Sequence, residues 1–129
     1  MKVASIVFFT VVLSLSLLWA CSGDSGGAAG AVEAYNQALV EGNEERLANL
    51  SCADWEADAR NELASFAAVK VTLENMQCSE TDQDGDTTLV ACSGKIIANY
   101  GNEVLEINLE DLTYQVVLEG GDWRMCGYR

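Results

Sequence analysis

The spacing of the apolar residues changes along the chain, and the first folded part has a helical repeat. Val32, Tyr35 and Leu39 recur three and four residues apart, as the buried face of a helix requires. Gly42 follows, and glycine readily takes the left-handed conformation that ends a helix. Asn43 then has the short polar side chain that caps a helix, so the pattern predicts two successive helices from residue 31 onward.

A third helix is expected from Asp54. Its apolar residues form one stripe, and its charged residues are expected to face water. The stripe consists of Trp55, Ala59, Leu63 and Phe66, and the water-facing set consists of Glu56, Asp58, Arg60 and Glu62. Three helices are therefore predicted before any strand.

From Val69 the period shortens to two, which is typical of a half-buried strand. A polar turn at residues 81–86 then leads into a long apolar strand at 87–100. Together these segments predict a β-hairpin. A turn centred on Gly85 would place Cys78 directly opposite Cys92.

The remaining residues predict three more strands in a bent sheet. After a break at residues 100–102, the expected inward positions along the chain are Leu105, Ile107 and Leu109, followed by Leu112, Tyr114, Val116 and Leu118. Because the inward positions change from odd to even, one extra residue is expected near Glu110 or Asp111, as a bulge that bends the sheet. Residues 120–121 predict the last tight turn, before a final strand at 122–128.

Residues 1–20 have the pattern of a bacterial export signal. Lys2 precedes an apolar run from Val3 to Leu18, a small residue, Ala20, lies before the cleavage point, and such segments are removed from the mature chain. The sequence Leu18-Trp19-Ala20-Cys21 resembles the lipobox of bacterial lipoproteins, in which the cysteine is acylated. We therefore expect Cys21 to carry a lipid anchor. A plain cleaved signal and an uncleaved membrane helix are the alternatives.

Residues 21–30 are rich in glycine and serine and are expected to form a flexible tether to a folded domain at 31–129. The residue after Cys21 is Ser22 rather than aspartate, so an outer membrane, where the cell has one, is the expected destination. The protein is therefore expected to be exported and anchored to the cell membrane or outer membrane, with its domain outside the cytoplasm.

The charge of the chain limits its partners. The 129 residues have a formal net charge of −13, and the few basic residues are scattered singly. Nucleic-acid binding requires a cluster of lysines and arginines, so nucleic acid is not an expected partner. Direct adhesion to anionic lipids is unfavourable for the same reason, which leaves the acyl chain as the membrane attachment.

Four cysteines remain after Cys21, and an even number outside the cytoplasm indicates disulfides. Three pairings are possible. The hairpin register favours Cys78 with Cys92, which leaves Cys52 to pair with Cys126. One observation opposes the second pair, since the last hairpin places Cys126 on the face opposite the expected core. A zinc site is not expected, because the sequence has neither a histidine nor a C-x-x-C pair.

Helices followed by a bent antiparallel sheet resemble the nuclear transport factor two-like fold, also called cystatin-like α+β. The ending Gly120-Gly121-Asp122-Trp123-Arg124-Met125-Cys126 is similar to that of small lipoproteins with this fold. The resemblance implies an α+β domain at residues 31–129, with N-terminal helices packed on a bent antiparallel sheet around a cone-like pocket. Some members bind ligands in that pocket and a minority are enzymes, so the fold alone does not choose a function.

The resemblance makes four aromatic residues candidates for lining this pocket, namely Tyr35, Trp55, Tyr114 and Trp123. Packing in the core is the simpler role for each, because all four lie on apolar stripes. Enzymes of this fold, such as ketosteroid isomerase and polyketide cyclases, use a pocket acid or histidine together with a donor such as tyrosine. Because no histidine is present and no acid is expected on an apolar stripe, no catalytic residue is assigned.

The segment Asp82-Gln83-Asp84-Gly85-Asp86 resembles the start of a calcium-binding loop. The twelfth position of such a loop requires a bidentate glutamate, and here it is Ser93. The same residues suit a hairpin turn. No metal and no cofactor are therefore expected.

The sequence as a whole predicts a lipid-anchored envelope domain that is not an enzyme and that binds a small apolar molecule or a neighbouring envelope protein. An isomerase or dehydratase that uses a pocket carboxylate and a tyrosine is the alternative. A purely structural lipoprotein is a third possibility.

Overall fold

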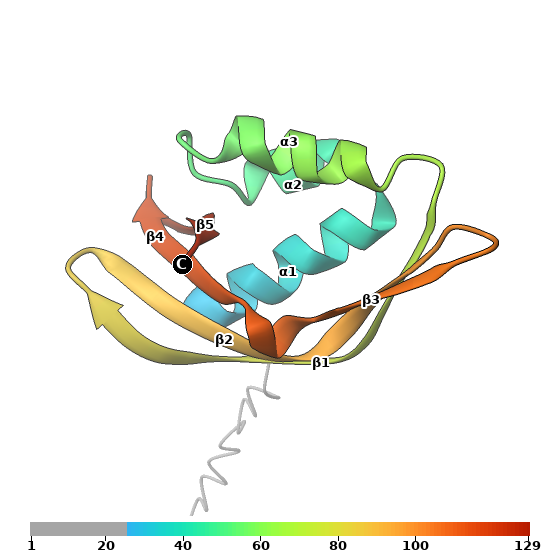
Figure 1. The fold of residues 1–129 in the computed structure, drawn as a ribbon. Coiled ribbons are helices and arrows are strands. Elements are labelled where there is room, and N and C mark those ends of the chain that lie inside the picture. The colour runs from blue at the N-terminus through green and yellow to red at the C-terminus, as the bar shows by residue number, and fades with distance from the viewer. Residues whose placement is uncertain (1–25) are drawn as a thin grey trace, which may run out of the picture.

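The computed structural model describes residues 26–129, which form three helices and a five-stranded antiparallel sheet (Figure 1). The helices are α1 (Gly27–Glu41), α2 (Glu44–Asn49) and α3 (Glu56–Ser65). The strands are β1 (Lys70–Asp84), β2 (Thr87–Asn99), β3 (Val104–Asn108), β4 (Thr113–Glu119) and β5 (Asp122–Tyr128), with a short 3-10 helix, η1 (Leu109–Asp111), between β3 and β4. This confirms the predicted α+β class. The predicted signal at 1–20 and the acylated Cys21 lie outside the described residues.

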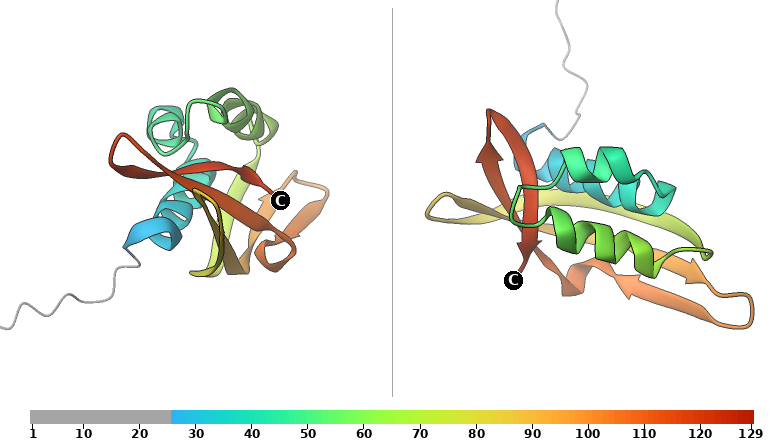
Figure 2. Two further views of the ribbon diagram at one scale, coloured as in Figure 1. Left: turned by 90° about the vertical axis from the view of Figure 1, so that its left-hand side faces the viewer. Right: turned by 90° about the horizontal axis from the view of Figure 1, so that it is seen from above.

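The core lies between α1 and the sheet. Helix α1 runs across the concave side of the curved sheet, and α2 and α3 lie farther out on the same side (Figures 1 and 2). The fully buried side chains include Val32, Leu39, Val90, Val116 and Met125. Burying each such side chain stabilises the fold by about 1.5–3 kcal/mol. No helix in the described range combines the length and the apolar character needed to cross a bilayer.

Helix α1 begins at Gly27, earlier than predicted, so residues 27–30 are not part of the tether. Ala28 and Ala29 are buried in its first turn. The backbone N–H of Ala28 donates to the Glu80 carboxylate on β1 at 3.3 Å, which fixes the start of the helix against the sheet. The small residues that indicated a flexible tether are small because α1 packs closely there.

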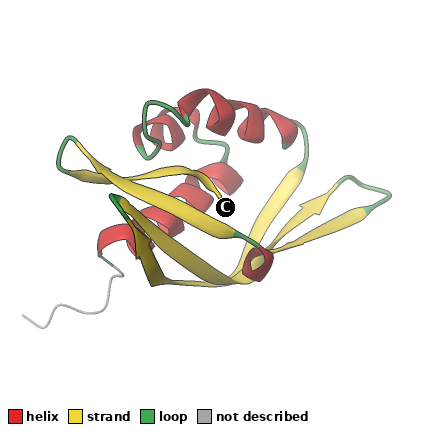
Figure 3. Ribbon diagram, turned by 60° about the vertical axis from the view of Figure 1, so that its left-hand side comes forward, coloured by secondary structure: helices red, strands yellow, loops and turns green. Residues whose placement is uncertain are grey.

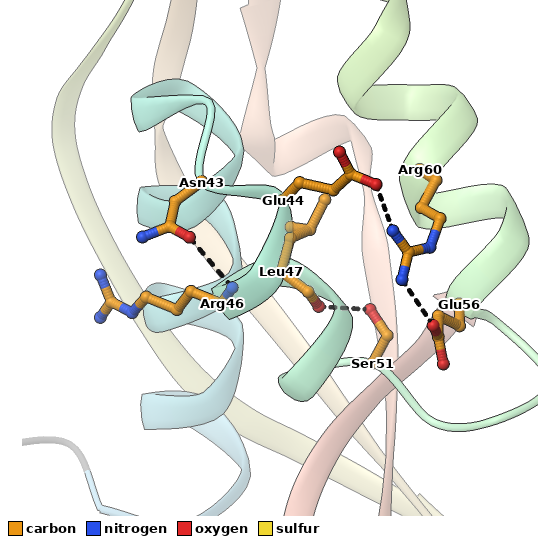
Figure 4. A network of polar contacts seen from close by, with 7 residues as sticks. All are labelled: Asn43, Glu44, Arg46, Leu47, Ser51, Glu56 and Arg60. Carbon is orange, nitrogen blue, oxygen red and sulfur yellow. Dashed lines mark hydrogen bonds and ion pairs between the residues drawn. The ribbon is translucent and has the colours of Figure 1, made fainter.

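Helices α2 and α3 are joined by charged side chains. Helix α2 begins at the predicted cap, since the side-chain oxygen of Asn43 accepts a hydrogen bond from Arg46 N at 3.0 Å. Figure 4 shows Arg60 of α3 in contact with Glu44 of α2 and, at 2.8 Å, with Glu56 of its own helix. These side chains are exposed, so the contacts contribute more to the orientation of the helices than to stability.

The β1–β2 hairpin has the predicted register at its cysteines, with Cys78 opposite Cys92. The turn itself is tighter than predicted and consists of residues 85–86. With this turn alone, the pairing of β1 with β2 would be shifted by one residue from the predicted register, and Cys78 would not lie opposite Cys92. An irregularity between Glu80 and Asp82 adds the extra residue that restores the predicted register.

The predicted bulge after β3 is a 3-10 turn instead, η1, with Leu109 buried inside it. Two of the expected inward positions are wrong, since Leu105 is 45% exposed and Leu118 is 57% exposed. Alternation identifies the two faces of a strand, but it does not show whether another element covers either face. At both positions no element covers the side chain well enough to bury it.

Both predicted disulfides are present, joining residues 14 and 74 positions apart in the sequence. The Cys52–Cys126 bridge forms because the segment after α2 pairs with the edge of β5. Met125 N donates to Leu50 O at 2.7 Å, and Cys52 N donates to Met125 O at 2.8 Å. The bridge therefore joins neighbouring backbone segments and does not cross the core. Disulfides persist in oxidising compartments, which supports a location outside the cytoplasm.

Candidate functional site

A carboxylate and two tyrosines meet where α1, α3 and β5 come together. The Tyr35 hydroxyl on α1 donates to Glu62 Oε2 at 2.6 Å, and the Tyr128 hydroxyl on β5 donates to Glu62 Oε1 at 2.6 Å. Tyr35 is fully buried, while Glu62 and Tyr128 are partly exposed. Each carboxylate oxygen of Glu62 thus accepts one short hydrogen bond, and the three residues are referred to below as the Glu62 cluster.

Two further aromatic residues extend this cluster. The indole N–H of Trp55 donates to the Tyr35 hydroxyl at 3.1 Å, and its ring meets the Tyr128 ring edge-on at 5.5 Å between centroids. The centroid of the Tyr114 ring lies 5.2 Å from the centroid of the Tyr128 ring. Asn36 is fully buried on α1, and its side-chain N–H donates to the Tyr114 hydroxyl at 3.2 Å.

Burial and the neighbouring carboxylate keep these tyrosines protonated. Desolvation is the main cause that raises the pKa of Tyr35 and of Tyr128, and the negative charge of Glu62 raises both further. Desolvation also raises the pKa of Tyr114 to about 12, although its hydrogen bond with Asn36 acts in the opposite direction. All three hydroxyls are therefore hydrogen-bond donors at physiological pH.

The position of Glu62 corrects the prediction that it faces water. The inward stripe of α3 includes positions 55, 59, 62 and 66, spaced by four, three and four residues, and Glu62 is on it. Sequence reasoning also missed Asn36 and Tyr128. Glu62 could have been found from its spacing to Ala59 and Phe66, because a carboxylate on an apolar stripe needs hydrogen-bond partners.

The four aromatic pocket candidates are not all in one place. Tyr35 and Trp55 belong to the network around Glu62, and Tyr114 joins it through its ring contact with Tyr128. Trp123 packs separately, beside Gly27 at the start of α1. None of the four lines the hollows described below, so their role as pocket residues stays a prediction.

An apolar groove lies between the end of α1, the end of α3 and the start of β1. Its volume is about 550 Å³. The side chains that give it an apolar wall include Leu39, Val40, Leu63, Phe66, Val69 and Val71. Glu41, Glu44 and Arg60 supply the charged part of the lining, where Arg60 is already paired with Glu44. The groove therefore offers apolar contact beside a charged rim, with slightly more apolar than polar surface.

A larger hollow of about 710 Å³ lies between α2, α3 and the β4–β5 turn, and it is lined mainly by charged side chains. Its two arginines already have partners. Arg60 contacts Glu44 and Glu56, and Arg124 donates to the backbone oxygen of Asn49. Both guanidinium groups are thus already engaged by protein groups, and the apolar groove is the better candidate for binding an apolar molecule.

The acidic segment at residues 82–86 forms the end of the β1–β2 hairpin, with Gly85 in the left-handed conformation. Asp84 there contacts Arg129 at 2.6 Å. Across residues 26–129, no group of three or more cysteine, aspartate or glutamate side chains is arranged to hold a metal ion.

The arrangement of helices and strands is similar to three solved structures. A candidate ketosteroid isomerase from Shewanella frigidimarina has a TM-score of 0.52 and 16% identity, covering 78% of this chain and 91% of that one. A candidate dehydratase of the NTF2-like family from Streptomyces avermitilis has a TM-score of 0.50 and 18% identity, covering 74% and 85%. This chain has the nuclear transport factor two-like fold.

A third similar structure is the helical cell shape determining protein Pgp2 from Campylobacter jejuni. It has a TM-score of 0.51 and 7% identity, and the match covers 78% of this chain but only 38% of Pgp2. No family model and no curated protein sequence matches this chain. At these identities the nuclear transport factor two-like likeness establishes the fold and leaves the activity open.

Proposed function

We propose that this protein is a lipid-anchored domain outside the cytoplasm that binds a small, uncharged apolar molecule without changing it chemically. The observation that carries the proposal is the apolar groove between α1, α3 and β1. Its volume of about 550 Å³ lies within the range of about 300–1,000 Å³ for small-molecule sites, which are mostly apolar with a few polar groups.

The charges around the groove disfavour an anionic ligand. Glu41 and Glu44 repel an anion, and Arg60 is held by two glutamates. A ligand that filled the groove would instead gain from covering Leu63, Phe66 and the other partly exposed apolar side chains, at about 25 cal/mol per Å² of apolar surface removed from water.

Native mass spectrometry of the full chain expressed in bacteria tests this function. We expect a mature chain that begins at Cys21 and carries fatty acyl groups, together with a small co-purifying molecule. A hetero-complex in place of the small molecule would favour the envelope-protein role. A chain without ligand that also fails to bind the apolar dye N-phenyl-1-naphthylamine would contradict the proposal.

Ala64→Trp is expected to weaken binding of that dye at least tenfold, because the indole would fill the groove. Ala64 is an exposed residue of α3 that lines the groove, so the larger side chain should leave the core unchanged. Dye fluorescence titrations measure the effect. Ala57→Trp is the matched control, since Ala57 is exposed on the same helix two turns earlier. Equal affinities for the two variants would place the dye elsewhere.

The Glu62 cluster favours an enzyme as the second candidate. An isomerase or dehydratase would use the carboxylate to take a proton from a carbon beside a carbonyl group, and a tyrosine hydroxyl to donate a hydrogen bond to the carbonyl oxygen. Tyr35 and Tyr128 are protonated donors that both bond to Glu62, so a substrate carbonyl would take over the hydrogen bond of one of them. The fold is shared with candidate enzymes of both kinds.

Glu62→Gln is expected to lower any such turnover by about 1,000-fold, since the amide keeps the size of the side chain but is no base. The measurement is a screen of ketosteroid and hydroxyacyl substrates with the wild-type chain and this variant. Glu33→Gln on α1 serves as the control for losing one carboxylate. A wild-type chain with no turnover in the screen would remove the enzyme candidate.

A further inference from the structure

The sheet has an uncovered edge at β3. On β1, the backbone N–H of Cys78 donates to Glu33 of α1 at 3.0 Å, so the helix occupies that edge at this residue. The edge of β5 is paired with the segment at residues 50–52. Among the described strands, β3 and β1 each pair with β2 alone, and the β2–β3 hairpin extends beyond the helices (Figure 3).

The register shows which backbone groups of β3 are free for another strand. Tyr100 N donates to Glu103 O at 2.8 Å, so this is a hydrogen-bonded pair, and hydrogen-bonded and non-hydrogen-bonded pairs alternate from there. Residues 105 and 107 therefore bond to β2. Val104, Glu106 and Asn108 direct their N–H and C=O groups outward, as an edge strand does when it can accept another strand.

The side chains at this edge are apolar on both faces of the sheet. Tyr100 is 47% exposed, Val104 57% and Leu105 45%. Val104 and Leu105 are consecutive in a strand, so they project to opposite faces. An added strand would have an apolar side chain of β3 beside it on either face.

The charge around the edge is negative. The exposed residues of this region include Glu103, Glu106, Glu110 and Asp111, and residues 100–113 contain no lysine or arginine. Lys95 on β2 pairs with Glu106 at 3.1 Å, and Lys70 on β1 lies one strand farther away, opposite Asn99. Two copies of this edge would place like charges opposite each other, which is destabilising. A basic strand would be attracted.

We propose that the outer edge of β3 binds an extended segment of a partner protein in which apolar and basic residues alternate. The segment adds to the sheet as a further strand, bonded to the outward groups of Val104, Glu106 and Asn108. Its apolar side chains lie on the face of Leu105, and its basic side chains lie on the opposite face, beside Glu106. This interaction is separate from ligand binding in the groove.

The test uses the full chain in a non-ionic detergent and a fluorescent peptide, acetyl-Val-Lys-Val-Lys-Val-Lys-Val-amide, followed by fluorescence anisotropy. We expect binding that weakens with salt, and no binding of the peptide with glutamate in place of lysine. Asn108→Pro should weaken binding about tenfold, because it removes one outward N–H. The φ of Asn108 is −74°, which proline adopts without strain.

Asn108→Ala is the matched control, since the side chain makes no capping hydrogen bond and alanine keeps the N–H. Amide hydrogen exchange on the wild-type chain gives a second readout that needs no variant. With the peptide bound, the amides of Val104, Glu106 and Asn108 should gain protection, while those of residues 105 and 107 should change little.

Three results would overturn the proposal. They are absence of binding by the lysine peptide, equal binding of the glutamate peptide, and unchanged exchange at the three outward amides. A dimer that protects those amides without peptide would assign the edge to a second copy of the chain instead.

Discussion

Replacing Cys52 and Cys126 together with alanine is expected to lower the free energy of unfolding by about 4.5 kcal/mol. The bridge closes a loop of 74 residues, and its main effect is to restrict the unfolded chain. A small domain has only about 5–15 kcal/mol of stability, so the variant should be close to unfolding at body temperature. Urea unfolding followed by tryptophan fluorescence measures the change.

The Cys78–Cys92 bridge provides the comparison for this prediction. It closes a loop of 14 residues, so replacing both of its cysteines with alanine should cost less, about 3 kcal/mol. Each double variant removes one bridge and leaves the other intact. If the Cys78–Cys92 variant lost as much free energy of unfolding as the Cys52–Cys126 variant, or more, local strain or packing rather than loop length would set the contribution of each bridge.

The cysteine pairing could be predicted in part because one bridge is local. The hairpin turn and the alternation of β1 and β2 together determine that Cys78 faces Cys92. The turn was placed slightly wrong, and the irregularity near Glu80 compensated for it. Sequence patterns therefore gave the right register without giving the right backbone path to it.

The second bridge was harder to predict because it depends on a contact distant in sequence. Reasoning from faces alone placed Cys126 away from the core, which argued against its pairing with Cys52. The structure shows that the pairing needs no shared face, because residues 50–52 lie along the edge of β5. A three-residue pairing outside any regular strand leaves no periodic pattern in the sequence.

The Glu62 cluster shows the same limit at the candidate site. Tyr35 was identified from its helical stripe, but Glu62 was assigned to the water-facing side of α3 by its charge. Its partners come from α1 and from the last residues of β5, so only the folded chain brings them together. Charge is a weaker guide to burial than position when hydrogen-bond donors are available inside.

Raising the pH above about 10 is expected to unfold this protein cooperatively, through Tyr35, Tyr114 and Tyr128. Their pKa values in the folded chain are raised above the unfolded value of about 10, chiefly by desolvation. The folded state therefore keeps protons that the unfolded state releases. Their contribution is complete below pH 10 and is lost as the pH rises towards the folded pKa values, of which that of Tyr114 is about 12.

The expected loss is about 1.4 kcal/mol per pH unit for each tyrosine, or about 4 kcal/mol per unit for three. Urea midpoints between pH 8 and 11.5 give the slope, and absorbance at 295 nm should show the tyrosines ionising together with unfolding. Tyr128→Phe should reduce the slope by about a third. Recovery of the original urea midpoint after return to pH 8 is the control that the disulfides have stayed intact. Ionisation of all three in the folded chain, without loss of structure, would contradict the burial on which the cluster depends.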